Sequence, residues 1–343
     1  MSGVTSGRTA QVGPPPEAIK AIPVRHPWRW VSAIVLLALA VDLVYMVTSS
    51  VCSDVTSAGS GCEAIGRYLF SPLILRGIVT TLALTVLAML IGVGGGVLLA
   101  VMRLSPNPVV SSLSWLYIWF FRGTPVLVQI FFWFNLNIVL HELGVGLPGT
   151  PFFILFGHTN SLINAFVAVL LGLGLNEAAY MAEIVRAGII SVEQGQTEAA
   201  QALGMTRLIV MQRIVLPQAM RVIIPPTGNE TISMLKTSSL AFIASERELF
   251  TASEQIALTT FAVVELIIVA SLWYLFMTTI LTIGQYYIER HFARGSQRAL
   301  PLTPFQRFRR MLVTFHAPPP EPPVSVGTLA VQRREDSGQG FHG

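Results

Sequence analysis

The strongest constraint on the fold is a series of long apolar runs that recur along most of the chain. Six of them lie at residues 31–48, 73–102, 116–139, 162–184, 222–244 and 257–287. A helix needs about 20 apolar residues to cross the hydrocarbon core of a bilayer. Charged residues make up 12% of the chain, whereas soluble domains carry about 25%. The sequence therefore predicts an all-α, polytopic transmembrane helical bundle with about six spans.

The first apolar run, residues 31–48, follows a polar arm at residues 1–30 that holds five prolines and that we expect to be disordered. The small residues Ala38-Leu39-Ala40 resemble a signal-peptide cleavage site. The apolar run continues beyond this site, which favours an uncleaved extra transmembrane anchor. Cleavage is the open alternative.

Both cysteines, Cys52 and Cys62, lie in the short loop that follows the first run. We expect this loop outside the cytoplasm, where an oxidising compartment allows a disulfide between them. Two free thiols are the open alternative. The six histidines show no metal-ligand spacing, so the sequence predicts no metal site.

Glycines concentrate in the second run, at Gly92, Gly94, Gly95 and Gly96. Small residues let membrane helices approach closely, so we assign this cluster to helix packing. The chain contains no Gly-x4-Gly-Lys-Ser/Thr pattern, and we therefore expect no ATP to bind this chain through a phosphate-binding loop.

The third run carries an arginine beside helix-breaking residues, in the sequence FRGTP at residues 121–125. An arginine within a span is costly and tends to face a cavity or a partner. A glycine and a proline interrupt the helix here and free backbone groups that can line a pathway. The candidate substrate pathway therefore begins with Arg122, Gly123, Thr124, Pro125 and Gln129. The open alternative is that Arg122 snorkels to the membrane edge.

The end of the fourth run adds Tyr180 and Glu183 to this candidate pathway. Glu183 is three residues before Arg186, so a local ion pair is the alternative role for it. Glu177 and Glu183 do not share one helical face. We therefore predict no paired-carboxylate site on this run.

The fifth run contains two prolines together with Asn229, Glu230 and Lys236. A broken, polar spanning segment is stable only where protein buries it or where it faces a cavity. We therefore expect a broken segment that completes the candidate pathway. The alternative is that Glu230 and Lys236 satisfy each other or the helix ends.

A polar loop at residues 191–220 separates the fourth and fifth runs. Thr197 is suited to cap a short helix and Gly204 to end it. Thr206 is suited to cap a second short helix, whose regularity Pro217 would break. Two short helices around a glycine form a compact knob beside the membrane, and such a knob suits docking into a cleft on a partner.

The same loop carries the residues of a known motif, EAA-x3-G-x9-I-x-LP, and in this respect the chain resembles bacterial ABC importer permeases. The matching residues are Glu198, Ala199, Ala200, Gly204, Ile214, Leu216 and Pro217. The stretches RGTP…Q, AAYMAE and GNE…LK resemble the polar amino acid branch of that family. Thr237 stands where that branch usually has an acidic residue. The resemblance covers residues 73–294.

The resemblance implies a permease domain of the type I importer kind, with residues 191–220 as the loop that couples to an ATPase. It implies a second permease, either identical or homologous, two ATP-binding subunits and an extracytoplasmic solute-binding protein. Transport of an amino acid would proceed by alternating access, with ATP bound by the partner subunit and no catalytic residue in this chain. The alternative is a secondary transporter driven by an ion gradient, with intramembrane glutamates as the ion site.

The distribution of basic residues predicts the topology. Lys and Arg gather in the N-terminal arm, in the loop at 191–220 and in the Pro-rich tail at 295–343, which we expect to be disordered. The positive-inside rule places these three segments in the cytoplasm, in a multi-pass protein of the bacterial inner membrane. Because the net charge of +4 arises from these loops and tails, it gives no indication of nucleic-acid binding.

Overall fold

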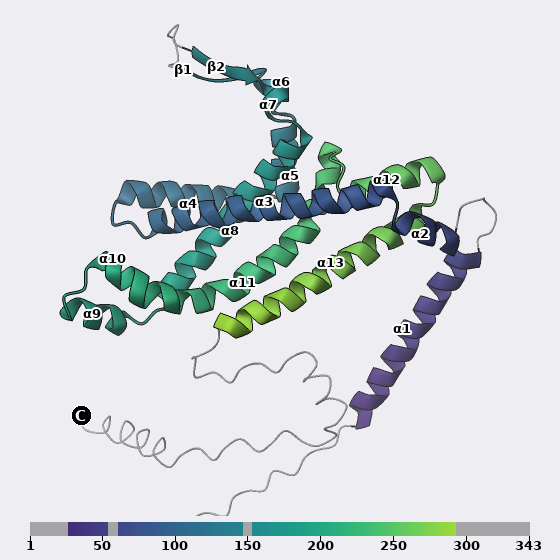
Figure 1. The fold of residues 1–343 in the computed structure, drawn as a ribbon, viewed down its shortest axis with the longest axis horizontal. Coiled ribbons are helices and arrows are strands. Elements are labelled where there is room, and N and C mark those ends of the chain that lie inside the picture. The colour runs from purple at the N-terminus through teal and green to yellow at the C-terminus, as the bar shows by residue number, and fades with distance from the viewer. Residues whose placement is uncertain (1–26, 54–60, 147–152, 293–343) are drawn as a thin grey trace, which may run out of the picture. The chain divides into compact units, whose positions relative to one another are not determined.

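The computed structural model describes residues 27–53, 61–146 and 153–292, which are almost entirely helical (Figure 1). Residues 42–301 form one compact unit. A second unit is described only at residues 27–41, the start of α1. The predicted tail at 295–343 and residues 1–26 of the predicted arm lie outside the described residues. Helix α1 (Pro27–Ser53) begins within the predicted arm, since a proline fits the first turn of a helix.

Two groups of elements follow α1 in chain order. The first comprises α2 (Cys62–Leu69), α3 (Pro72–Arg103), α4 (Pro108–Gly123), α5 (Val126–Phe134), α6 (Leu136–Val139), strands β1 (Glu142–Gly146) and β2 (Phe153–His158), α7 (Thr159–Leu162) and α8 (Ala165–Ile190). The second comprises α9 (Gln194–Ala202), α10 (Arg207–Val210), the π-helix η1 (Met211–Val215), α11 (Leu216–Thr237), the 3-10 helix η2 (Ser238–Ala244), α12 (Leu249–Thr260) and α13 (Val263–Phe292).

Four helical segments are long and apolar enough to cross a membrane: α3, α8, residues 207–244 and α13. The pair α4 and α5 passes the same test together but bends by 98°, which makes five spans if the pair counts as one. Helix α1 contains the shorter apolar stretch Ile34–Met46. The crossing of residues 31–48, and with it a sixth span, stays a prediction.

Helices α3 and α8 pack closely along their length because glycines of α3 face α8. A Cβ atom at Gly92 would overlap the side chain of Glu177, and one at Gly96 would overlap Met181. Gly94 has open space instead. The predicted packing role therefore holds for part of the glycine cluster, and it brings the backbones of the two helices together.

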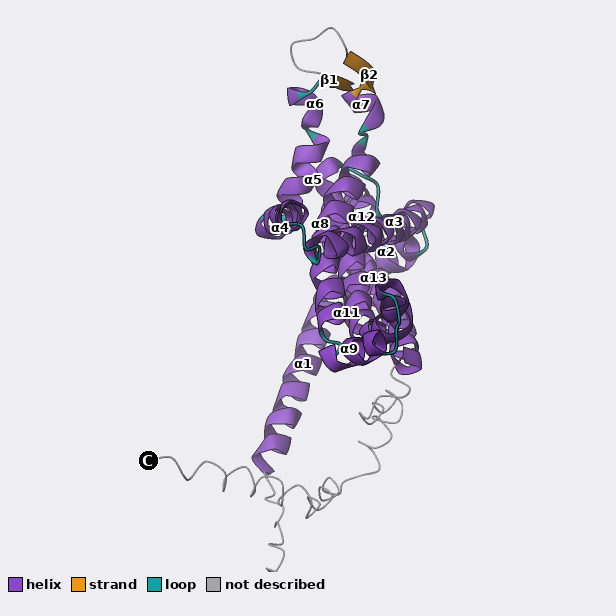
Figure 2. Cartoon of the chain, turned by 90° about the vertical axis from the view of Figure 1, so that its left-hand side faces the viewer, coloured by secondary structure: helices purple, strands orange, loops and turns teal. Residues whose placement is uncertain are grey.

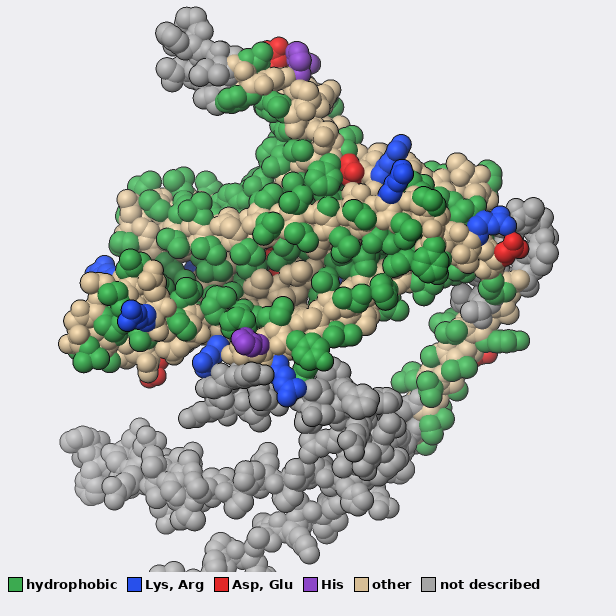
Figure 3. Space-filling model, viewed as in Figure 1, with side chains coloured by type: hydrophobic (Ala, Val, Ile, Leu, Met, Phe, Trp, Pro, Cys, Tyr) green, Lys and Arg blue, Asp and Glu red, His purple; other side chains and the backbone are tan. Residues whose placement is uncertain are grey.

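The outer surface of the helices is apolar, as a lipid environment requires. Leu98 on α3 and Leu275 on α13 are about two-thirds exposed in the isolated chain, at 62% and 64%. Figure 3 shows apolar side chains over most of the visible face of the helices, with Lys and Arg near their ends. These helices bury only part of their apolar surface within one chain.

Four expected segments differ from the structure. Helix α4 starts at Pro108 rather than near residue 116, because the Asn107 side chain accepts a hydrogen bond from Val109 N and caps the helix. Between the third and fourth runs, where the sequence predicts no further element, β1 and β2 form an antiparallel hairpin, in which Glu142 pairs with His158 beyond α6 and α7 (Figure 2).

The last run also divides. Helix α12 is closed by its C-cap residue Phe261, whose φ of 60° is left-handed, and α13 begins at Val263.

The predicted break in the fifth run is wrong, since α11 continues through Pro225 and Pro226. The Gln285 side-chain amide donates to the Pro225 carbonyl, and the Thr227 hydroxyl donates to Ile223 O. Helix α11 also packs against α8 and α13, and neighbouring helices let a membrane helix tolerate internal proline.

Candidate functional site

The predicted knob is formed by α9, the turn at Gly204, α10 and η1, where α8 ends and α11 begins (Figure 1). Helix α9 begins at Gln194, so the expected start at Thr197 is wrong. The helix extends three residues upstream of Thr197, through Gly195, and Glu193 occupies its N-cap position. Thr206 does occupy the N-cap position of α10, although its side chain makes no capping hydrogen bond.

Gly204 closes α9 as the sequence predicts. Its φ is +79°, a left-handed conformation that glycine adopts at little cost. Its N–H donates to Gln201 O at 2.9 Å, and the next N–H, of Met205, donates to Ala200 O at 3.1 Å. These two bonds are the Schellman arrangement that satisfies the last carbonyls of a helix. The turn direction of the knob therefore depends on this glycine.

The knob has an inner and an outer face. Ala200 is buried and packs with Val210 and Val215, which fixes α9 against the following helices. Leu203 and Leu208 are instead 83% and 66% exposed. Two large apolar side chains exposed together on a polar loop mark a surface that is suited to a protein partner.

Pro217 does not break the second short helix as expected. The π-helix η1 joins α10 to α11, and Pro217 is the second residue of α11, at the junction of the two helices. The knob is consequently continuous with a long helix of the bundle. A displacement of the knob can thus be transmitted directly to α11.

The break between α4 and α5 falls at Thr124 and Pro125, as predicted. Gln129 Nε2 donates to Phe121 O, Thr124 O and Thr124 Oγ1, at 2.8 to 3.1 Å. Asn176 Nδ2 on α8 also donates to Phe121 O, at 2.8 Å. Two amide side chains thus satisfy the backbone that the break leaves free.

Arg122, in the last turn of α4, is exposed and lies over the ring of Tyr180, with its Cζ 5.2 Å from the ring centroid. The structure therefore brings together two residues predicted for the pathway from different runs. A cation–π contact of this kind is worth about 0.5–1 kcal/mol where exposed. It holds α4 against α8 next to the break.

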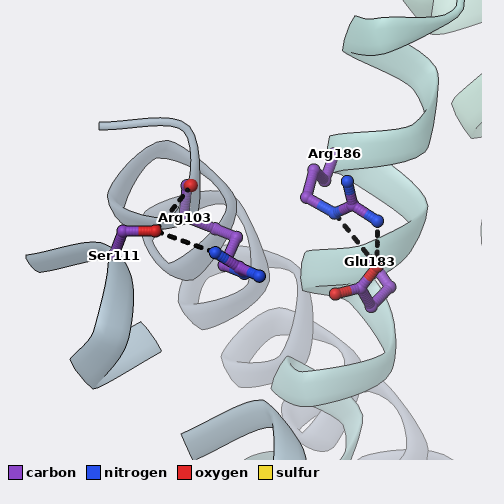
Figure 4. Close-up of polar contacts among 4 residues, drawn as sticks. All are labelled: Arg103, Ser111, Glu183 and Arg186. Atoms are coloured by element: carbon purple, nitrogen blue, oxygen red, sulfur yellow. Dashed lines mark hydrogen bonds and ion pairs between the residues drawn. The ribbon is translucent and has the colours of Figure 1, made fainter. Parts of the chain in front are cut away.

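Glu183 forms a local ion pair rather than a pathway contact. Its Oε2 lies 2.8 Å from Arg186 Nη2, three residues further along α8 (Figure 4). Beside it, Arg103 Nη1 donates to Ser111 Oγ, and Ser111 Oγ donates back to Arg103 O, across the turn between α3 and α4. The Arg103–Ser111 bonds tie the end of α3 to the start of α4, whereas the Glu183–Arg186 pair lies within α8.

The polar residues of α11 do not form the pair considered from the sequence. Asn229 Oδ1 accepts a hydrogen bond from Gln285 Nε2 on α13, which also donates to Glu289 Oε1. Lys236 is exposed and takes part in none of the ion pairs of the described residues, including with Glu230. The structure therefore separates Lys236 from Glu230.

Three buried glutamates of the described residues were missing from the predicted pathway: Glu177, Glu248 and Glu265, of which Glu265 on α13 accepts a hydrogen bond from Gly61 N. Glu177 on α8 is 4% exposed, and its Oε1 has no hydrogen-bond partner in the described part of the chain. The sequence shows Glu177 but gives no indication of its burial, because the α3 glycine that lies against it, Gly92, comes from another part of the chain.

Glu248 is the second buried glutamate and is fully hydrogen-bonded. It caps α12 through Phe250 N and Thr251 N, at 2.8 and 2.7 Å. It also accepts hydrogen bonds from Tyr274 OH on α13, at 2.8 Å, and from Thr81 Oγ1 on α3. This carboxylate therefore connects three helices.

A cavity of about 1120 Å³ lies among α3, α8, α11 and α13. Its walls are mostly apolar, from Ser105 and Met211 near the knob to Met181 and Thr231 deeper in the bundle. Elsewhere in the chain, Cys52 and Cys62 are joined as a disulfide. The described residues contain no group of three or more His, Cys, Asp or Glu that could hold a metal ion.

Comparison with known proteins identifies relatives for most of the chain. Residues 92–294 match the family described as "Binding-protein-dependent transport system inner membrane component". The arginine transport system permease protein ArgU of Corynebacterium glutamicum is 46% identical over 88% of this chain and 91% of its own length. The probable amino-acid permease protein YxeN of Bacillus subtilis is 37% identical over 64% of this chain and 91% of its own.

Solved structures agree with this assignment. The crystal structure of an amino acid ABC transporter with histidines superposes with a TM-score of 0.57 and 33% identity, over 66% of this chain and 97% of the other. A bacterial ABC transporter involved in the import of the acidic polysaccharide alginate has a TM-score of 0.51 at 13% identity, over 76% and 96% of the chains. The second likeness concerns the fold alone.

Proposed function

The chain belongs to the family of binding-protein-dependent transport system inner membrane components, and we propose that it is the permease that carries a cationic amino acid into the cell. Its relatives are amino-acid permeases of ABC importers. The chain is accordingly an amino-acid ABC permease, a multi-pass membrane protein rather than a secondary transporter driven by an ion gradient.

The knob is the observation that carries the mechanistic part of the proposal. Its glycine turn fixes two short helices, and it exposes Leu203 and Leu208 on the outer face. We assign this face to a cleft in an ATP-binding subunit, which supplies the ATP site and all of the hydrolysis chemistry. No residue of this chain is given a catalytic role.

The continuity of the knob with α11 supplies a mechanism for alternating access. η1 leads without interruption into the helix that carries Asn229 and Glu230. When ATP closes two ATPase subunits, the knobs of two permeases move with them and shift both copies of α11. The pathway then opens outward to an extracytoplasmic solute-binding protein and returns inward after hydrolysis. The second permease is a further copy of this chain or a homologous one.

The proposed substrate class rests on the similarity to the arginine permease ArgU, which extends over 88% of this chain. The shared region includes most of the helices that surround the pathway, because only about an eighth of the chain lies outside it. We therefore propose a substrate with a cationic side chain.

The proposed orientation follows from the basic residues and the cysteines together. The knob and both termini face the cytoplasm, where an ATPase can reach the knob and where Lys and Arg accumulate. The loop that holds Cys52 and Cys62 then faces the oxidising side of the membrane, which is compatible with their disulfide.

Reconstitution tests the proposed function. The chain is placed in proteoliposomes with its ATP-binding subunit and solute-binding protein, and uptake of radiolabelled arginine is measured. We expect uptake that requires ATP on the side of the membrane that the knob faces. This uptake should persist when ionophores remove the proton and sodium gradients. Uptake that follows an ion gradient and continues without ATP would overturn the proposal.

A further inference from the structure

We infer that Gln285 is a positioning residue that holds α13 to α11, so that the two helices move as one unit when the knob is displaced. The inference rests on the proposed function, in which the ATPase moves the knob and the knob moves α11. It extends that movement to a second helix of the bundle. It assigns to Gln285 no contact with the substrate or with ATP.

The first argument is that the side-chain amide of Gln285 reaches from α13 to α11. Its Nε2 donates to Pro225 O at 3.2 Å and to Asn229 Oδ1 at 3.0 Å. The two acceptors belong to residues four positions apart, which lie on the same face of α11. An amide that bonds two successive turns opposes sliding of α13 along α11 as well as separation of the two helices.

A carboxylate on α13 fixes the direction in which this amide points. Gln285 Nε2 also donates to Glu289 Oε1, at 2.6 Å and four residues further along the same helix. Only the nitrogen side of an amide can donate to a carboxylate, whereas its oxygen side would be repelled. The nitrogen carries two hydrogens, so one serves Glu289 and the other is shared between the two acceptors on α11. Glu289 therefore keeps the donor of Gln285 turned towards α11.

The second argument is the space that α11 leaves for this amide. A Cβ atom at Gly228 would lie 2.7 Å from Cγ and from Cδ of Gln285. Glycine lowers the stability of a helix interior, so its presence there needs a reason. The close approach of the amide supplies that reason, because any larger residue at position 228 would push the amide away from α11.

The third argument is the position of this contact on α11. Pro225 and Pro226 have no N–H group, so α11 lacks the hydrogen bonds that these residues would make to the carbonyls of Arg221 and Val222. The helix therefore bends most easily in this turn, which lies between the knob and Gly228. Helix α13 packs beside α11 and contains no proline (Figure 1). Bonded to Pro225 through Gln285, it supports the turn from outside, so that α11 is displaced rather than bent.

The fourth argument is that the two helices line one cavity together. Gly228 and Thr231 of α11 and Gln285 and Ile288 of α13 all border the cavity of about 1120 Å³. A displacement of α11 alone would slide one part of this wall past the other. A joint displacement instead widens or narrows the cavity, as alternating access requires. The contact at Gln285 thus determines which of the two movements follows when the knob shifts.

The number of arginine molecules imported for each ATP hydrolysed tests the inference directly. It is measured in proteoliposomes that hold the permease, its ATP-binding subunit and the solute-binding protein, with the thermal midpoint recorded on the same preparations. Gln285→Leu keeps a side chain of similar volume over Gly228 but removes the donor. We expect its ATP hydrolysis to stay within about twofold of the wild type while uptake per ATP falls about fivefold or more. The reason is that the knob still docks, whereas α11 bends at its prolines.

Gly228→Ala reaches the same amide from the other helix. Its Cβ atom displaces the side chain of Gln285, so we expect a similar fall in uptake per ATP although the glutamine is still present. This variant covers the case in which Gln285→Leu does not fold. Because both changes remove the same contact, the double variant should couple no worse than the more affected single variant.

The matched control is Thr279→Val, which removes a side-chain hydrogen bond within α13. Thr279 Oγ1 donates to Leu275 O on an exposed side of the helix. The control should therefore import as much arginine per ATP as the wild type. If the folded variants Gln285→Leu and Gly228→Ala keep the wild-type uptake per ATP, whatever their thermal midpoints, Gln285 only stabilises the fold and the inference is overturned.

The same assay separates this inference from the proposed function. If the wild type shows no ATP-coupled arginine uptake, the proposed function itself fails. If the wild type couples uptake to ATP and both variants couple it equally well, the chain is the permease, but the joint movement of α11 and α13 does not depend on Gln285.

Discussion

The knob and the pathway are built in opposite ways. All contacts that shape the turn of the knob join residues close in sequence, such as Gly204 with Gln201 and Met205 with Ala200. The residues predicted for the pathway are held by distant segments, as in the bonds from Asn176 to Phe121 and from Gln285 to Asn229. A local device can be recognised from a short motif, whereas a pathway made of several helices cannot. A substitution in the knob should therefore abolish coupling without changing the stability of the bundle. A substitution in the packed helices should instead destabilise the whole bundle.

The largest effect expected in the knob is the loss of coupling in Gly204→Pro. Proline fixes φ near −65°, which is incompatible with the left-handed turn at +79°. We expect ATP-driven uptake to fall to about a tenth or less while the thermal midpoint of the bundle stays unchanged, since the turn lies outside the packed helices. The control is Gly195→Ala, which has open space in α9 and should transport normally. Normal uptake by Gly204→Pro would show that the shape of the knob is not required for coupling.

The interface between α3 and α8 should respond in the opposite way, because a substitution there lowers the stability of the bundle. Gly96→Leu forces a side chain into Met181 and should destabilise the bundle by about 1–3 kcal/mol. Its thermal midpoint in detergent should therefore fall. Gly94→Leu has open space on the same helix and should leave the midpoint unchanged. Equal midpoints for the two variants would mean that α3 and α8 do not pack as described.

A comparable effect is expected for Glu248→Ala, because it removes the cap of α12 together with bonds to α3 and α13. The Phe250, Thr251 and Tyr274 donors lose their acceptor, at a cost of about 1–2 kcal/mol for a helix cap and each buried donor. The measurement is again thermal unfolding, with Glu254→Ala, an exposed position on α12, as the control. A midpoint equal to that of the control would contradict the role of this carboxylate in connecting three helices.

The smallest effect concerns the contact between Arg122 and Tyr180. Arg122→Gln removes the cation but keeps a polar side chain, and the lost contact should cost about 0.5–1 kcal/mol. A double-mutant cycle with Tyr180→Leu measures the coupling between the two side chains. A coupling of zero would return Arg122 to the alternative interpretation, in which it only reaches the membrane edge.

The contrast between local contacts and contacts across distant segments also explains which features the sequence could predict. The apolar runs predicted the spanning helices, since length and hydropathy are local properties, and Pro125 predicted the break after α4. The break expected at Pro225 was wrong, because α11 continues through it while packed against α8 and α13, which come from other parts of the chain. The roles of Glu177 and Glu248 were missed for the same reason, as their neighbours come from other helices. Thr197 is a residue type that suits an N-cap, but the three residues before it are also helical and α9 begins at Gln194.

The most direct test of the account is whether the outer face of the knob binds the ATPase. Leu203→Asp places a charge on a side chain that is 83% exposed, so folding should be unaffected, while docking into an apolar cleft should fail. The measurement is the dissociation constant between the permease and its ATP-binding subunit, with Leu203→Met as the matched control. We predict binding weakened at least tenfold, with ATP-driven uptake lost, in Leu203→Asp only. Wild-type affinity and uptake in Leu203→Asp would contradict the account.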